Sequence, residues 1–214
     1  MGPPGAGKGT QGELLSKRLG IRCLASGNIL REAIRNGDLI GKQAARHMEQ
    51  GSLVPDQLVT DLILKRLEPM GSGDSFVLDG FPRTEVQARA LDARLAQREQ
   101  PAVDVAVDFE MPAEKIIRRL AGRRICRGCG ANYHLQNQPP KKPNVCDLCG
   151  EQLQAREDDG PATIRKRLVV YHEETEPLLK FYRVQGKLRA VPGDLQIEEQ
   201  YRAVVDLLKK EGLL

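Results

Sequence analysis

Residues 2–10 combine glycines, a lysine and a threonine at a spacing that suits phosphate binding. They read GPPGAGKGT and follow G-x-x-x-x-G-K-[ST], the pattern of a phosphate-binding loop, or P-loop, except that Gly9 separates Lys8 from Thr10. The glycines let the backbone curl so that several N–H groups point at one anion, and the helix expected after the loop directs its positive dipole end to the same place. Lys8 adds a positive charge for β- and γ-phosphates, and Thr10 offers its hydroxyl to a bound Mg²⁺. The alternative is a loop that is merely rich in glycine, but a nine-residue pattern of this kind rarely arises by chance.

Four cysteines form two C-x₂-C pairs at a spacing typical of zinc sites. They are Cys126, Cys129, Cys146 and Cys149. A glycine follows the second cysteine of each pair, at Gly130 and Gly150, and permits a tight turn. Two such turns close a tetrahedral shell around Zn²⁺ with no open position, so we expect a structural ion that holds a segment poor in large apolar residues. Two disulfides or free thiols are the alternatives, and Cys23, outside the set, is expected to be a buried small hydrophobe.

The composition is that of a soluble globular chain. Of 214 residues, 40% are hydrophobic and 29% are charged, and the net charge is +4. Aromatic residues make up 4% and Trp is absent, which argues against stacking on single-stranded nucleic acid. Neither a signal peptide nor an apolar run of membrane-spanning length is visible. We therefore expect a cytoplasmic protein with no nucleic-acid or membrane partner.

Apolar runs that alternate with helical periodicity predict an α/β fold with a parallel sheet and helices on both faces. Strands are expected at 21–25, 75–79, 103–109 and 187–191. Helices are expected at 11–19, 26–36, 39–50, from 56 onwards, 84–95, 112–122, 163–183 and 197–210, with Asp56 as an N-cap. Residues 123–160, which are rich in Cys, Gly, Pro and Asn, interrupt this alternation and read as an inserted module.

Several motifs together resemble adenylate kinases of the long-lid, zinc-containing bacterial type, over essentially the whole chain. In chain order they are the P-loop, ASGNILR at 25–31, LDGFPRT at 78–84, GRR at 122–124, the four cysteines, REDD at 156–159 and RKRL at 165–168. The resemblance implies reversible transfer of the γ-phosphoryl group of Mg·ATP to AMP, giving two ADP, by a monomer. It also implies a core of residues 1–25, 56–122 and 160–214, a helical insert over AMP at 26–55, and a zinc lid over ATP at 123–159.

The resemblance further assigns site residues. On the ATP side it implies Gly5, Ala6, Gly7, Lys8, Gly9, Thr10, Arg119 and Arg123. On the AMP side it implies Ser26, Arg31, Gly80, Arg83, Gln87, Arg156 and Arg167. The catalytic charges would be Lys8, Arg83, Arg123, Arg156 and Arg167, and Mg²⁺ would be held by Thr10 and, through water, by Asp79. Phosphoryl transfer needs positioning and charge neutralisation, which suits this set of arginines. The alternatives are arginines that face solvent and an Asp79 that caps the next turn.

Two features depart from the family pattern. Asn28 stands where the family usually has Asp, which removes one charge beside the AMP region. Only Met1 precedes the P-loop, so the expected first strand is missing; the start lies upstream, or the chain is truncated, or the sheet lacks its middle strand. For a chain that starts at Met1 we expect a gap between two pairs of strands, and poor folding or weak ATP binding.

Other functions remain open at this point. One is a P-loop kinase for another nucleoside monophosphate. Another is a non-catalytic, zinc-stabilised nucleotide-binding protein, should the missing strand abolish activity. A nucleic-acid-binding zinc ribbon is a third, and it would require a steep dependence of affinity on salt.

Overall fold

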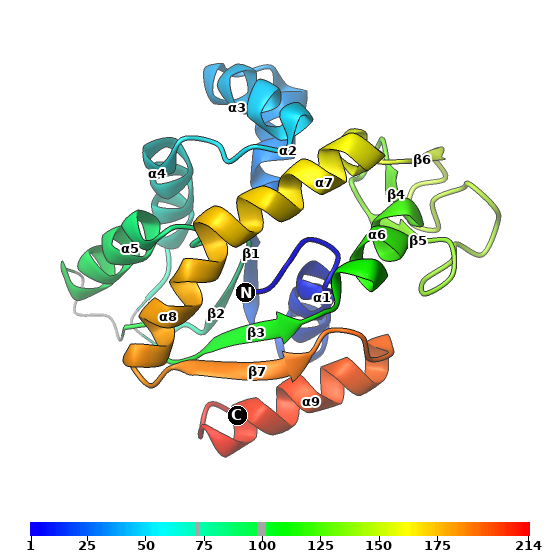
Figure 1. Cartoon of the computed structure of the whole chain (residues 1–214). Coiled ribbons are helices and arrows are strands. Elements are labelled where there is room, and N and C mark those ends of the chain that lie inside the picture. Colours follow the sequence, from blue (N-terminus) through cyan, green and yellow to red (C-terminus); the bar gives the residue numbers. More distant parts are fainter. Residues whose placement is uncertain (72, 98–101) are drawn as a thin grey trace.

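The computed structural model describes residues 1–214 except 72 and 98–101 (Figure 1). The α/β fold is confirmed. The main strands are β1 (Arg22–Ala25), β2 (Phe76–Asp79), β3 (Ala106–Glu110) and β7 (Leu188–Pro192). The helices are α1 (Lys8–Leu19), α2 (Ser26–Asn36), α3 (Leu39–Gln50), α4 (Asp56–Leu67), α5 (Glu85–Gln97), α6 (Ala113–Ala121), α7 (Pro161–Val170), α8 (Glu176–Val184) and α9 (Ile197–Lys210). A small antiparallel sheet consists of β4 (Arg123–Cys126), β5 (Asn132–His134) and β6 (Leu153–Gln154).

The four main strands form two parallel pairs, which is the arrangement expected for the sequence as given. β1 pairs with β2, and β3 pairs with β7, and in the described residues no ladder joins the pairs. Met1 lies against β3: its amino group donates to the Val107 carbonyl, and its own carbonyl accepts from the Phe109 N–H at 3.2 Å. The predicted start of β3 at residue 103 was wrong, because regular pairing with β7 begins only at Ala106.

Glycines end α2 and α3, two of the three helices that lie between β1 and β2. Gly37 and Gly51 follow α2 and α3 with φ of 68° and 71°, a left-handed conformation that favours glycine. The prediction that Asp56 caps α4 was wrong, since Pro55 holds the N-cap position and Asp56 is the first helical residue. Its carboxylate instead accepts hydrogen bonds from Thr84 and Gln87, both at 2.8 Å, and so ties α4 to the start of α5.

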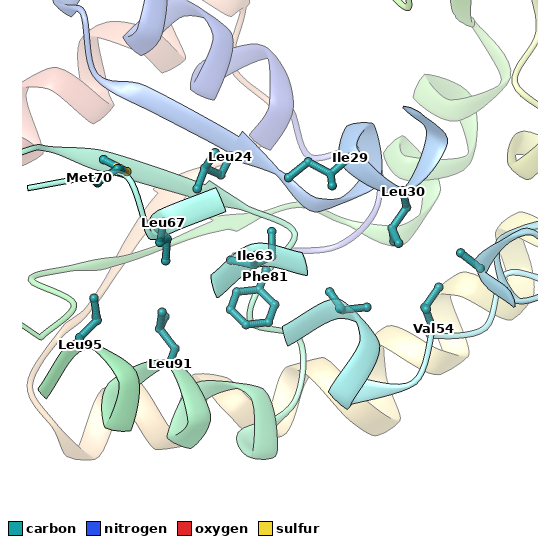
Figure 2. Close-up of a cluster of buried hydrophobic side chains, with 12 residues drawn as sticks. Leu24, Ile29, Leu30, Val54, Ile63, Leu67, Met70, Phe81, Leu91 and Leu95 are labelled. Atoms are coloured by element: carbon teal, nitrogen blue, oxygen red, sulfur yellow. The ribbon is translucent and has the colours of Figure 1, made fainter. Parts of the chain in front are cut away.

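A buried apolar cluster joins β1 to α2, α4 and α5 (Figure 2). Ile63 of α4 and Leu91 of α5 are fully buried in it, and Phe81, from the turn after β2, packs in the same cluster. Each such side chain contributes about 1.5–3 kcal/mol by leaving water. The cluster therefore gives firm support to the ends of β1 and β2, where ligands bind in parallel sheets.

The helix predicted at 163–183 is continuous but not regular. A π-helical turn, Tyr171–Thr175, separates α7 from α8. In Figure 1 the combined helix runs from the small sheet β4–β6 across the front of the molecule to α5. A single π turn inside an α-helix often marks a functional region. Among the described residues, no helix is both long and apolar enough to cross a membrane.

Candidate active site and metal centre

The P-loop curls because three of its glycines adopt a positive φ, which other residues rarely take. Gly2, Gly5 and Gly7 have φ of 116°, 88° and 96°, and Gly7 occupies the N-cap of α1. The Lys8 ammonium group folds back over the loop and donates to the carbonyls of Gly2 and Pro3, both at 2.7 Å. Burial lowers the pKa of Lys8 to about 8, although nearby Asp79 acts in the opposite direction. The loop thus holds a buried cation at a helix N-terminus, an arrangement that attracts anions.

One cavity of about 300 Å³ brings most of the sequence-predicted residues together. It is lined by Gly5, Gly7, Lys8, Gly9, Thr10, Ser26, Arg31, Asp79, Gly80, Arg83, Gln87, Arg119, Arg123, Arg156 and Arg167. Ala6 does not line it: the residue is fully buried, and its N–H donates to the Pro3 carbonyl at 3.3 Å. The four cysteines do not line it either.

Positive charge exceeds negative charge in this cavity. Among the described residues that line it, seven side chains are Lys or Arg and three are Asp or Glu. Burial, and then the neighbouring Arg156, lower the pKa of Arg31 to about 9 and that of Arg123 to about 10. An anion that enters would relieve this mutual repulsion, so the cavity favours a ligand with several negative charges.

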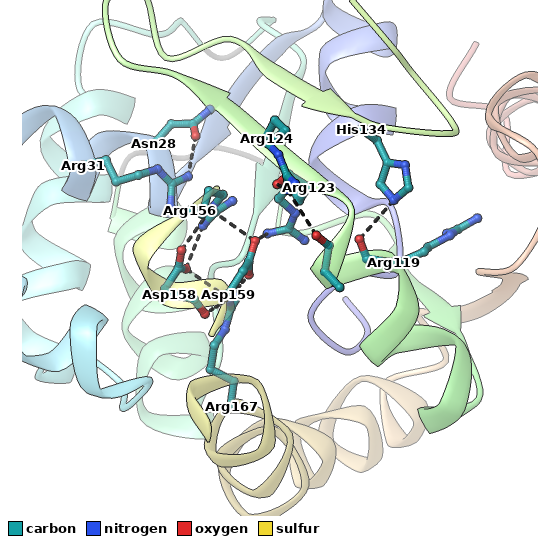
Figure 3. A network of polar contacts seen from close by, with 11 residues as sticks. Asn28, Arg31, Arg119, Arg123, Arg124, His134, Arg156, Asp158, Asp159 and Arg167 are labelled. Carbon is teal, nitrogen blue, oxygen red and sulfur yellow. Dashed lines mark hydrogen bonds and ion pairs between the residues drawn. The ribbon is translucent and has the colours of Figure 1, made fainter. Parts of the chain in front are cut away.

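Two acidic residues hold three of these arginines in place (Figure 3). Arg156 binds Asp158 through two hydrogen bonds of 2.9 and 2.8 Å. Arg167 Nη1 lies 3.1 Å from Asp158 Oδ2 and 2.9 Å from Asp159 Oδ1, and Arg123 Nη1 lies 3.6 Å from Asp159 Oδ2. Burial raises the pKa of Asp158, but Arg156 and Arg167 outweigh burial and hold that pKa well below its usual range. The network fixes guanidinium groups that would otherwise be mobile.

The turn after β2 places Arg83 against the cavity. Gly80 has φ of 70°, and a Cβ added there would lie 2.8 Å from Ser26 Oγ and 2.9 Å from Arg83 Nη2, so only glycine fits. The Gly80 carbonyl accepts from Ser26 Oγ at 2.7 Å and from Arg83 Nε at 2.8 Å. The Phe81–Pro82 bond is cis, as the resemblance implies. Among the described residues no N–H of this turn donates to Asp79, whose carboxylate lies beside Gly9.

Gln87 and Arg119 lie on the cavity wall with their polar groups already engaged. Gln87 Nε2 donates to Asp56 at 2.8 Å, and its Oε1 accepts from the Arg83 N–H at 2.8 Å. Arg119 donates to the carbonyls of Gly193 at 2.7 Å and Leu195 at 3.0 Å. These bonds orient both side chains before any ligand arrives.

Part of the cavity wall was missed by sequence reasoning. Apolar residues from α2, α3 and α4 and from the segment between α3 and α4 line it, namely Leu30, Met48, Leu53, Val54 and Val59. Their apolar pattern in the sequence predicted burial in the core and gave no indication that they line a cavity. His134 also lines the cavity; its Nε2 donates to the Arg119 carbonyl at 3.1 Å, and burial lowers its pKa. Asn28, not assigned a role, accepts a 2.6 Å bond from Arg31.

The four cysteines converge at one point between β4 and β6. Their Sγ atoms all lie within 4.8 Å of one another, with 3.3 Å between Cys126 and Cys149 and 3.5 Å between Cys129 and Cys146. Four thiolates around a tetrahedral Zn²⁺ with bonds of about 2.3 Å stand about 3.8 Å apart, so the cluster fits such an ion. The group can hold a metal ion. Cys23 lies apart from the cluster, and it is half-buried rather than fully buried as expected.

The local backbone shapes this cluster as the sequence pattern predicted. Gly130 and Gly150 have φ of 76° and 77°, and each N–H donates back to the carbonyl of the first cysteine of its pair, at 3.1 and 3.0 Å. A hydrogen bond with Tyr133 is the main reason why the pKa of Cys146 falls to about 6. The thiolate is the form of cysteine that binds a metal ion.

Comparisons with known proteins agree with this geometry. A family model described as adenylate kinase matches residues 1–187. The chain is 46% identical over 211 residues to an adenylate kinase of Caldicellulosiruptor saccharolyticus, which covers 99% of this chain and 98% of that protein. It is 45% identical over 208 residues to one of Lachnospira eligens, with 97% of each chain covered. For one of Archaeoglobus fulgidus the identity is 43% over 210 residues, covering 98% and 96%.

Proposed function

The chain belongs to the adenylate kinase family, and from this premise we propose how its residues divide phosphoryl transfer between ATP and AMP. The overall reaction is transfer of the γ-phosphoryl group of Mg·ATP to AMP, which gives two ADP and is reversible. The convergence of a P-loop and seven cationic side chains on one cavity carries this proposal. Two nucleotides that meet there would bring many phosphate oxygens, which is the ligand such a cavity favours.

On the ATP side, the P-loop amides and Lys8 bind the β- and γ-phosphates, and Arg119 lies against the adenine. Mg²⁺ that arrives with ATP would be held by Thr10 and, through water, by Asp79, and it supplies charge neutralisation. The position of both residues on the cavity wall, with the Asp79 carboxylate beside Gly9, is compatible with this role.

On the AMP side, Arg31 and Arg83 bind the phosphate, and Gln87 reads the adenine edge. The apolar wall that includes Leu30, Val54 and Val59 offers a surface on which a flat base can pack. Arg123, Arg156 and Arg167 lie between the two sides and stabilise charge on the transferring group. No general base is needed, since the attacking AMP phosphate is already anionic.

We further propose that residues 26–55 and 123–159 act as two closing segments over a core. Contacts between them and their surroundings support this. Asn132 donates to Glu13 of α1 at 3.1 Å, and the Arg35 guanidinium of α2 packs against Gly130, where an added Cβ would lie 3.2 Å from Nη1. Closure excludes water, which would otherwise accept the phosphoryl group. A structural Zn²⁺ on the four cysteines would give the second segment its shape.

The activity is tested by ADP formation from ATP with AMP, GMP, CMP or UMP as acceptor. For zinc-replete protein we expect kcat/KM for AMP to exceed that for the other acceptors by about 10²-fold. Equal use of another acceptor would assign the chain to a different nucleoside monophosphate. If no ADP forms with any acceptor, the result would favour a non-catalytic nucleotide-binding protein. The two separate strand pairs are compatible with this alternative.

Asn28→Asp is expected to raise KM for AMP about two- to fivefold and to leave KM for ATP unchanged. A carboxylate at this exposed position would pair with Arg31 and compete with the AMP phosphate, and exposed pairs contribute about 0.2–1 kcal/mol. Steady-state kinetics at low salt measure the effect, which should shrink as salt screens the pair. An unchanged KM for AMP would contradict the role given to Arg31.

A further inference from the structure

We propose that Gln200 of α9 is a positioning residue for the P-loop, which it holds in the orientation that binds the phosphates of ATP. The inference rests on the proposed function, because it adds a further residue to the proposed ATP site. Gln200 lies outside every sequence motif discussed above, and it reaches the loop from a helix close to the end of the chain.

The Gln200 side chain is buried and its hydrogen-bonding groups are engaged. It is 2% exposed, and its Nε2 donates to the carbonyls of Ala6 and Pro192, both at 3.2 Å. Its Oε1 accepts from Gln11 Nε2 at 3.0 Å. Gln11, from the first helix after the loop, is equally buried and also donates to the Ile197 carbonyl at 3.1 Å. The two amides therefore join the P-loop, α1, α9 and the end of β7.

The bond to Ala6 controls a peptide that faces the phosphates. In a planar trans peptide, the carbonyl of one residue and the N–H of the next point in opposite directions. Because the Ala6 carbonyl points at Gln200, the Gly7 N–H points away from α9. Ala6 is fully buried, whereas Gly7 lines the cavity, as this orientation requires. Gln200, which also lines the cavity, thus orients an anion-binding N–H through its bond to the Ala6 carbonyl.

Gln200 also leaves no room for the loop to shift toward α9. A Cβ added to Gly7 would lie 2.5 Å from Gln200 Oε1, so the bare glycine packs directly on the amide. A P-loop residue held this closely keeps its N–H preorganised, and preorganised donors are what stabilise transferring charge. The alternative is a core glutamine that contributes stability only, and the two roles differ in what they do to ATP binding.

The test compares Gln200→Leu with Val204→Ala. Val204 lies one helical turn further along the buried face of α9 and is 2% exposed, so its truncation is a matched loss of packing without loss of the amide. For Gln200→Leu we expect the Kd for ATP to rise about tenfold, with the Kd for AMP changed less than twofold. For Val204→Ala we expect a lower melting temperature and an unchanged Kd for ATP.

A double-mutant cycle with Gln11→Leu provides a second measurement. Because one hydrogen bond joins the two amides, the effects of Gln11→Leu and Gln200→Leu on the Kd for ATP should be clearly less than additive. The inference is overturned if Gln200→Leu leaves the Kd for ATP within twofold, or if Val204→Ala weakens ATP binding as much. Equilibrium binding needs no turnover, so these results stand even if wild-type protein forms no ADP and the proposed function fails.

Discussion

Arg123→Ala is expected to lower kcat by about 10³-fold or more, the largest effect of any single substitution considered for this chain. Arginines that stabilise the transferring phosphoryl group contribute about 10³–10⁵ to the rate. Arg123 lines the cavity, and burial together with Arg156 lowers its pKa to about 10, so its charge has no full counterion until substrate arrives. A charge that acts in the transition state changes kcat and kcat/KM together, and steady-state kinetics with varied ATP and AMP will show this.

The fold should survive this substitution. Asp159, the carboxylate nearest to Arg123, keeps its 2.9 Å bond to Arg167. Arg124→Ala is the matched control: Arg124 is the next residue on β4, it donates to the carbonyls of Ala121 and Arg123 at 3.1 and 2.7 Å, and it does not line the cavity. We expect Arg124→Ala to change kcat by less than about twofold. A rise in KM with an unchanged kcat for Arg123→Ala would show that Arg123 only binds substrate.

Removal of metal from the cysteine cluster is expected to have the second-largest effect. The buried apolar core of this module is small, comprising Cys126, Tyr133, Cys146 and Leu153, so two of its four members belong to the cysteine cluster that can hold a metal ion. Without an ion the module has little to hold it together. Since β4 carries Arg123, loss of the module's shape would also displace the charge that we propose to be catalytic. We expect kcat to fall about 10²-fold in Cys146→Ser.

Three measurements check this prediction. Wild-type protein should bind one Zn²⁺ per chain, and Cys146→Ser should lose it. Amides of residues 123–159 should exchange hydrogen much faster in the variant, while those of the β3–β7 pair stay protected. If unfolding loses about 3 kcal/mol, a chain of this size melts about 6–12 °C lower. Cys23→Ala, outside the cluster, is the control and should keep the ion. A metal-free protein with unchanged exchange and activity would contradict the role of the cluster.

Local patterns made the two main sites readable from sequence. The residues that form the P-loop and the turns at Gly130 and Gly150 are neighbours along the chain. Backbone sterics alone therefore impose their geometry. Such features need no knowledge of distant parts of the molecule.

Predictions of which partner a given side chain binds were less successful. Asp56 has the sequence context of an N-cap, yet it bonds to Gln87 and Thr84, because packing of α4 on α5 brings those donors to it. The sequence indicates a charged cluster that contains Arg156, Asp158, Asp159 and Arg167. It does not indicate which arginine binds which carboxylate. A hydrogen bond forms only over a narrow range of distances. Which donor pairs with which acceptor therefore depends on differences in atomic position of a fraction of an ångström to a few ångströms, and the tertiary structure sets these.

By itself, the sequence determined the α/β class, the phosphate loop, the four-cysteine cluster and the family, since each depends on residue type and spacing along the chain. Only the tertiary structure decided that Arg31, Arg83 and Arg123 face one cavity, that Asn28 holds Arg31, and that Gln200 supports the P-loop. Ala6 and Gln200 are 194 positions apart. No local pattern encodes such a contact, because it exists only once the burial of apolar side chains has packed α9 against α1.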